Sequence, residues 1–139
     1  MSIRRRQLAT LACLVLIASY PAFVLGYTGA HVVQSELPGG KNGPLDAYRH
    51  TLASAVVAYT LSPVAVYWTT RVMESGDKDA NRMDRHNNRI GAAIGAQAVR
   101  FDEIEPSVLA HVLQGSVGAN DSQMTTWLPA SDWRAARFW

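Results

Sequence analysis

The sequence predicts an all-α protein, a small domain of about four helices behind one N-terminal helix that spans a membrane or acts as a signal peptide. Apolar residues recur at helical spacing after residue 44, and proline and glycine mark the expected helix ends. Residues 8–27 carry no charge, and no stretch shows a convincing strand pattern. The chain of 139 residues has room for one domain, which we place at residues 31–139 behind a membrane segment at residues 1–30.

The N-terminal segment has the charge pattern of a targeting sequence. Arg4, Arg5 and Arg6 precede the uncharged run of residues 8–27. An arginine cluster before a span keeps the N-terminus in the cytoplasm, so we expect the body in the periplasm or outside the cell. Residues 24–26 and 28–30 each match a cleavage site imperfectly, which favours an anchor in the inner membrane over an exported, cleaved protein. A buried core helix is the third interpretation.

The charge of the chain argues against nucleic-acid binding, and its cysteine content excludes an intrachain disulfide. The net charge is +2, but without the three N-terminal arginines the chain has 10 basic against 11 acidic residues. The body therefore lacks the positive charge typical of nucleic-acid binding. Cys13 is the single cysteine, which excludes an intrachain disulfide.

Turn-forming residues divide the first half of the body. Residues 28–44 are expected to form a linker because glycine and proline are dense in their second half. Pro44 suits the first position of a helix that should continue to Leu61. Ser62 followed by proline predicts a second helix, capped by the serine and ending at Gly76.

A third helix is expected to end near Ala98. Asp77 or Asp79 can cap its N-terminus. Gly91 and Gly95 lie one turn apart among alanines, a smooth strip that lets another helix approach closely.

The last third of the chain should be less regular. Glu105 and the proline after it predict a shorter helix through Leu113 or Gln114, followed by a loop over residues 115–121. Residues 131–139 can form one or two helical turns. The expected apolar anchors of this tail are Trp127, Trp133, Phe138 and Trp139.

The first of two polar clusters consists of Asp46, Arg49 and His50. Asp46 and His50 lie four residues apart and share a helix face, with Arg49 beside them. Such a pair can bind a divalent metal ion, act as a general base in which Asp46 orients His50, or form a salt link at a helix N-terminus. Taken alone, the cluster favours the salt link.

The second polar cluster lies in the third expected helix and consists of Asp84, His86, Asn87 and Asn88. Adjacent asparagines disfavour a helix, which indicates that their hydrogen-bonding capacity is needed there. Asn87 falls on the apolar stripe, so we expect it to bridge to the preceding cluster and hold His50 or Asp46. The alternative is a helix that begins at this point, with Asp84 or Asn88 as its cap.

The two clusters would form one hydrolytic site if their helices pack antiparallel. Its candidate residues are Asp46, Arg49, His50, Asp84, His86, Asn87 and Asn88, and the candidate ligands of a divalent metal ion are Asp46, His50, Asp84 and His86. A His–Asp base or a metal-bound water would attack a phosphoester or acyl centre, and Arg49 would stabilise the negative charge. No nucleophile elbow, P-loop or dinucleotide fingerprint is present. His31 and His111 lack acidic partners at helical spacing and are interpreted as incidental.

Both clusters resemble motifs of a bacterial family of unknown function found in secreted and surface proteins, including C-terminal domains of toxin-like proteins. The family pattern is Asn-Gly-x-x-Asp-Ala-Phe-Arg-His-Ala, then His-Glu, then Met-Asp-x-His-Asn-Asn-x-x-Gly. Residues 42–50 read Asn-Gly-Pro-Leu-Asp-Ala-Tyr-Arg-His, and residues 83–91 read Met-Asp-Arg-His-Asn-Asn-Arg-Ile-Gly. The resemblance covers the motif core at residues 42–91. It implies a small extracytoplasmic helical domain and, through the toxin context, a hydrolase.

The middle of the family pattern departs from this sequence. Met73 and Glu74 stand where the family has His-Glu. If the family's histidine is a ligand or a base, Met73 cannot replace it, and the site is impaired or differently specialised. We expect Glu74 to be a solvated residue near the helix end.

Two functions follow as hypotheses. The first is a membrane-anchored or exported hydrolase of the cell envelope that acts on a phosphoester, phospholipid or peptidoglycan bond. The second is a non-catalytic, membrane-tethered binding or assembly protein whose polar residues form a structural network. The expected partners are the membrane, through residues 8–27, and an envelope substrate or protein, with no nucleic acid.

Overall fold

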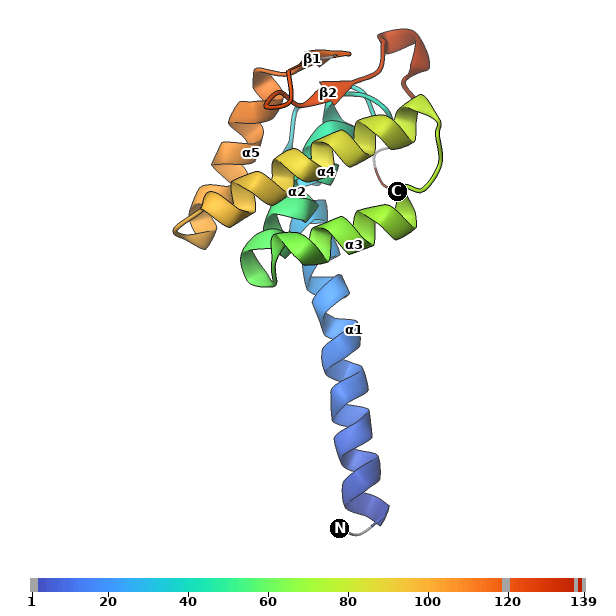
Figure 1. The fold of residues 1–139 in the computed structure, drawn as a ribbon, viewed down its shortest axis with the longest axis vertical. Helices are drawn as coiled ribbons and strands as arrows, with labels where there is room; N and C mark the ends of the chain where they lie inside the picture. Colours follow the sequence, from blue (N-terminus) through green and yellow to red (C-terminus); the bar gives the residue numbers. More distant parts are fainter. Residues whose placement is uncertain (1–2, 119–120, 137, 139) are drawn as a thin grey trace.

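The computed structural model describes residues 3–118, 121–136 and 138, and it confirms the all-α prediction. Four α-helices, α2 to α5, form a small domain, and α1 projects from it as a long shaft (Figure 1). The one expected anchor that falls outside the described residues is Trp139.

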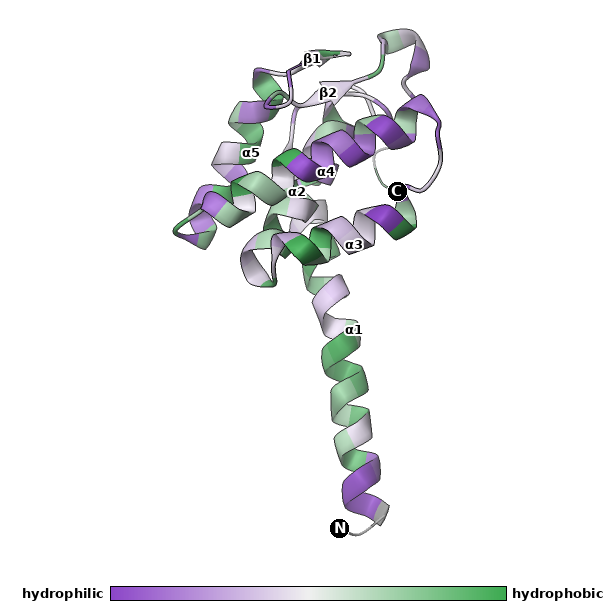
Figure 2. Ribbon diagram, in the orientation of Figure 1, coloured by the Kyte–Doolittle hydropathy of each residue, from purple (hydrophilic) through white to green (hydrophobic). Residues whose placement is uncertain are grey.

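Helix α1 spans Ile3–Gln34, so it includes part of the expected linker. Its segment Arg4–Gln34 is long and apolar enough to cross a membrane or to serve as a signal sequence. Figure 2 shows the hydrophilic N-terminal turn followed by a hydrophobic shaft. The expectation of a linker from residue 28 was wrong, because Thr28 and Val32 on the last turns of α1 are buried against the domain.

Helices α2, Pro44–Thr60, and α4, Asp79–Gln97, form the centre of the domain and cross in close contact. The expected smooth strip on α4 explains this closeness. A Cβ atom on Gly91 would lie 2.2 Å from the Thr51 carbonyl oxygen, and one on Gly95 would lie 2.1 Å from the Ala55 carbonyl oxygen. Only glycine at both positions permits this approach of the two backbones.

Helix α3 spans Pro63–Met73 and begins as predicted, since the Ser62 hydroxyl accepts a hydrogen bond from the Ala65 N–H at 3.2 Å. The prediction of an aspartate cap on α4 was wrong. Lys78 holds the cap position without a side-chain hydrogen bond, and Asp79 forms an ion pair with Arg82 in the first turn.

The C-terminal third contains a 3₁₀ turn, Phe101–Glu103, and helix α5, Ile104–Leu113. A short parallel pair follows, with β1 at Ser116–Val117 and β2 at Thr126–Trp127. Strand β1 lies in the segment that was expected to be a loop, and the sequence showed no convincing strand pattern at β2.

The tail has one 3₁₀ turn at Ala130–Asp132. Trp127 packs on the core, whereas Phe138 is exposed and does not act as the expected anchor. The Trp133 indole N–H donates to the Leu128 carbonyl at 2.7 Å.

Candidate functional site

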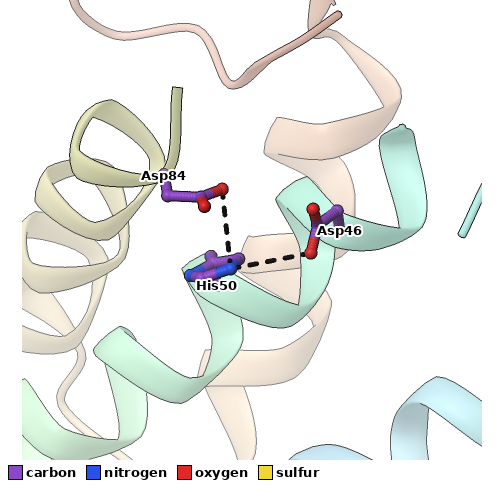
Figure 3. Close-up of side chains that lie close together, drawn as sticks. All are labelled: Asp46, His50 and Asp84. Atoms are coloured by element: carbon purple, nitrogen blue, oxygen red, sulfur yellow. Dashed lines mark ion pairs between the residues drawn. The ribbon is translucent and has the colours of Figure 1, made fainter. Parts of the chain in front are cut away.

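Three of the predicted site residues meet between α2 and α4. The His50 Nε2 atom lies 3.6 Å from Asp46 Oδ1 and 3.5 Å from Asp84 Oδ1 (Figure 3). One donor atom from each residue lies within 4.8 Å of the other two. The packing of α2 on α4 thus joins the two sequence clusters at these residues. The expected antiparallel arrangement was wrong: Gly91 lies against Thr51 and Gly95 against Ala55, so the two helices run in the same direction where they touch.

Asp46 is fixed from two sides. Its Oδ2 atom accepts the Asn42 N–H at 2.6 Å, where Asn42 adopts a positive φ of 70° just before α2. Its Oδ1 atom forms an ion pair with Arg49, whose side chain is also buried. The Arg49 guanidinium therefore holds Asp46 inside the protein rather than standing at the surface to receive a substrate anion.

His50 is the member of the cluster that solvent reaches most easily. Its side chain is 17% exposed, against 1% for Asp46 and 8% for Asp84. Burial lowers the pKa of His50 below its usual 6.5, although Asp46 and a hydrogen bond to Asn88 favour the protonated form. A neutral imidazole results, which is the form that binds metals and accepts protons.

Asp84 has the most perturbed carboxyl group of the site. Burial, followed by the nearby charges of Asp46 and Glu74, raises its pKa from 3.8 to about 8, and Lys41 and Arg49 only partly oppose this. Its Oδ1 atom is buried and receives no hydrogen bond from the described part of the chain. An acceptor in this state either keeps a proton or binds a cation.

The three residues fit a divalent metal ion by chemistry and by distance. Imidazole nitrogen and carboxylate oxygens are ligands that zinc and related ions accept. Ligand atoms that share one ion at about 2.0–2.5 Å stand at most about 4–5 Å apart, and the three donor atoms here lie within 4.8 Å of one another. Three protein ligands would leave a coordination position for water, as in catalytic sites.

His86 does not join this cluster, contrary to the prediction. Its Nε2–H donates to the Met124 carbonyl at 2.7 Å, in the segment that leads into β2. His86 follows Asp84 by two residues, and two residues along a helix correspond to a rotation of about 200°, which directs their side chains to opposite faces.

Asn87 is fully buried as predicted, but it does not hold Asp46 or His50. Its amide N–H donates to the Thr126 carbonyl at 2.8 Å, and its Oδ1 atom accepts the Thr126 N–H at 2.9 Å. The pair of bonds imitates a strand partner for β2. Asn87 therefore connects α4 to the C-terminal segment through two hydrogen bonds.

Asn88 takes the bridging role that the sequence assigned to its neighbour. Its Oδ1 atom accepts the Ser54 hydroxyl at 2.9 Å, and its side chain also contacts His50. Sequence reasoning did not single out Ser54 or Lys41. Ser54 lies on the same face as His50, four residues later, and this spacing is the signal that could have identified it.

Glu74, expected to be a solvated residue, is half-buried, and its charge acts on both His50 and Asp84. Met73, which stands at the place of the family's histidine, is 70% exposed on α3. The three-residue cluster is therefore built without a side chain from position 73.

Comparisons with known proteins add no relative: no family model matches the chain, and neither does any curated protein or solved structure. The resemblance of residues 42–91 to the bacterial family stays a prediction.

Proposed function

We propose that the protein is a membrane-anchored hydrolase of the bacterial cell envelope whose centre is Asp46, His50 and Asp84. The observation that carries the proposal is the convergence of one imidazole and two carboxylates from separate helices, with donor atoms within 4.8 Å of one another. Burying this set is costly unless a proton or a cation balances the carboxylates. A functional site accounts for that cost.

The residues have distinct roles in this proposal. His50 Nε2, Asp46 Oδ1 and Asp84 Oδ1 would hold a divalent metal ion, which supplies a water with a lowered pKa when it is bound. Arg49 orients Asp46, and Asn88 orients His50. Residues that bond to metal ligands without touching the metal commonly have this role. The exposed edge of His50 marks the side from which a substrate would enter.

Metal binding by the full-length protein in detergent tests the proposal, with two histidines as a matched pair. We expect His50→Ala to weaken Zn²⁺ or Mn²⁺ affinity by at least about 100-fold in calorimetric titration, because it removes a ligand. His86→Ala should leave the affinity unchanged and lower the melting temperature, because His86 bonds only to the Met124 carbonyl in the described structure. Equal affinity in both variants and the parent would refute the metal site.

Activity is the second readout. The metal-loaded protein should hydrolyse at least one of three substrate classes, namely soluble phosphoesters, phospholipids or peptidoglycan. Asp84→Asn should abolish that activity while the fold persists, because the amide is nearly isosteric with the neutral acid. A folded parent that binds metal but leaves all three classes intact would argue against a hydrolase.

One observation favours a second candidate, a non-catalytic assembly protein with a structural polar network. Asn87 and His86 both direct their hydrogen bonds to the backbone of the C-terminal segment. In this case Asp46→Ala and Asn87→Ala would each lower the melting temperature strongly, and neither metal nor chelator would change it.

A further inference from the structure

Helix α3 has an apolar outer face. Val64, Trp68 and Val72 follow one another at intervals of four residues and are 62%, 58% and 76% exposed. Val66, on the opposite side of the helix, is 5% exposed. A helix on the surface of a water-soluble domain normally turns its polar side outward. Helix α3 departs from this arrangement, because apolar side chains lie on its outer face as well as at the buried Val66, so its outer face requires a partner.

The position of α3 indicates where that partner lies. The Tyr20 hydroxyl of α1 is 2.6 Å from the Thr60 hydroxyl at the end of α2, so the turn into α3 stands at the level where α1 leaves the domain. Helix α3 packs on α2 and α4. In Figure 1, α4 lies on the side of α3 away from the free end of α1. The outer face of α3 is therefore turned toward the projecting shaft.

The length of the uncharged run places the membrane surface at the same level. Residues 8–27 are uncharged, and at 1.5 Å per residue twenty helical residues span about 30 Å, the thickness of the hydrocarbon core. Tyr20 lies seven residues before the end of this run, or about 10 Å along the helix. If the bilayer is centred on this run, its hydrocarbon core thus extends beyond the level of the contact between Tyr20 and Thr60.

We propose that α3 is an interfacial helix whose outer face lies in the outer leaflet of the same bilayer that α1 crosses. The proposal rests on the membrane anchor of the proposed function but not on hydrolysis. The side chains suit this depth: Trp68 and Tyr67 are typical of membrane interfaces, and Arg71 can reach lipid phosphates. Helix α3 contains no acidic residue. Figure 2 shows hydrophobic segments on both α3 and the shaft.

This arrangement sets the orientation of the domain. One transmembrane helix would leave the domain free to rotate and tilt, whereas a second contact at α3 fixes the face that meets the lipid. Pro63 and Met73 at the helix ends are exposed, and so is Leu61 in the preceding turn, at 59%. The contact therefore extends along the whole helix.

Spin labels on the full-length protein in vesicles of phosphatidylethanolamine and phosphatidylglycerol test the proposal. The native Cys13 reports whether α1 is in lipid. Val72→Cys and Val64→Cys, each in a Cys13→Ser background, report on α3, and Ser122→Cys in the same background is the aqueous control beyond β1. We expect labels on α3 to be more accessible to oxygen than to a water-soluble nickel complex, and the reverse at Ser122.

The possible results separate the proposal from the anchor on which it rests. A lipid signal at Cys13 with water-like signals at both α3 sites would overturn the interfacial helix and leave the anchor intact. A water-like signal at Cys13 would overturn both. Protection of the α3 labels from both reagents, with dipolar coupling between labels, would show that a second copy of the chain covers α3, and this would also overturn the proposal.

Discussion

At the scale of single residues, the proton on Asp84 decides the state of the site. The pKa of this carboxyl group is raised to about 8, whereas that of His50 is lowered. At neutral pH without metal, a protonated acid thus faces a neutral base. Metal binding must displace the proton from Asp84, so metal affinity should rise as the pH approaches 8.

The same shift predicts how stability depends on pH. The folded state keeps the Asp84 proton up to about pH 8, while the unfolded chain loses it near pH 4, so the free energy of unfolding falls as pH rises between these values. His50, whose folded pKa lies below its usual 6.5, is neutral in the folded state over this range, and the proton that the unfolded chain still releases just above pH 6.5 offsets only a small part of this loss. With chelator present, we expect a loss of roughly 1.5–2 kcal/mol between pH 6.5 and 8 in urea unfolding.

The control for this experiment is Asp84→Asn, which cannot bind the proton and should show a flat profile over the same range. A parent profile that stays flat from pH 6.5 to 8, or that rises, would contradict a neutral Asp84.

Single-residue reasoning from the sequence predicted part of this site. The pairing of Asp46 with His50 follows from a spacing of four residues, which helix geometry fixes. The placement of His86 was wrong although the same geometry excludes it. The partner of Asn87 could not be predicted, because Thr126 belongs to an irregular segment whose path no periodicity determines.

At the scale of elements, the crossing of α2 and α4 depends on two glycines. We expect Gly91→Ala and Gly95→Ala each to lower the free energy of unfolding by at least about 2 kcal/mol, because the new methyl group would overlap a carbonyl oxygen of α2. Thermal or urea unfolding in detergent measures the loss. Gly29→Ala on α1 is the matched control, because nothing lies within 4 Å of its added Cβ.

These variants also test whether α2 and α4 together form the metal site. Separation of the helices would move Asp84 away from Asp46 and His50, so metal affinity should fall together with stability. Unchanged stability in both variants would show that the helices can move apart at no cost. The glycine spacing made this contact predictable, whereas the two-residue strands were too short to leave a pattern in the sequence.

At the scale of the whole molecule, α1 combines a segment long and apolar enough to cross a membrane with a C-terminal part that packs on the domain. Val24 and Thr28, in the C-terminal half of α1, are 6% and 0% exposed, so this part of the helix is buried against the domain. Cleavage after Gly26 or Ala30, the two imperfect sites in the sequence, would remove Val24 from the core and, at the later site, Thr28 as well. This loss is a physical reason to expect an uncleaved anchor.

Two adjacent valines test whether the end of α1 is part of the folded core. Val32 is 0% exposed and Val33 is 63% exposed, although both are valines of the same helix. In the full-length protein we expect Val32→Ala to lower the free energy of unfolding by about 2 kcal/mol through lost burial and the cavity left behind. Val33→Ala should change it by less than about 0.5 kcal/mol. Equal effects of the two substitutions in urea unfolding would show that α1 stands apart from the domain, and the bilayer, α1 and α3 would then no longer share one fixed geometry.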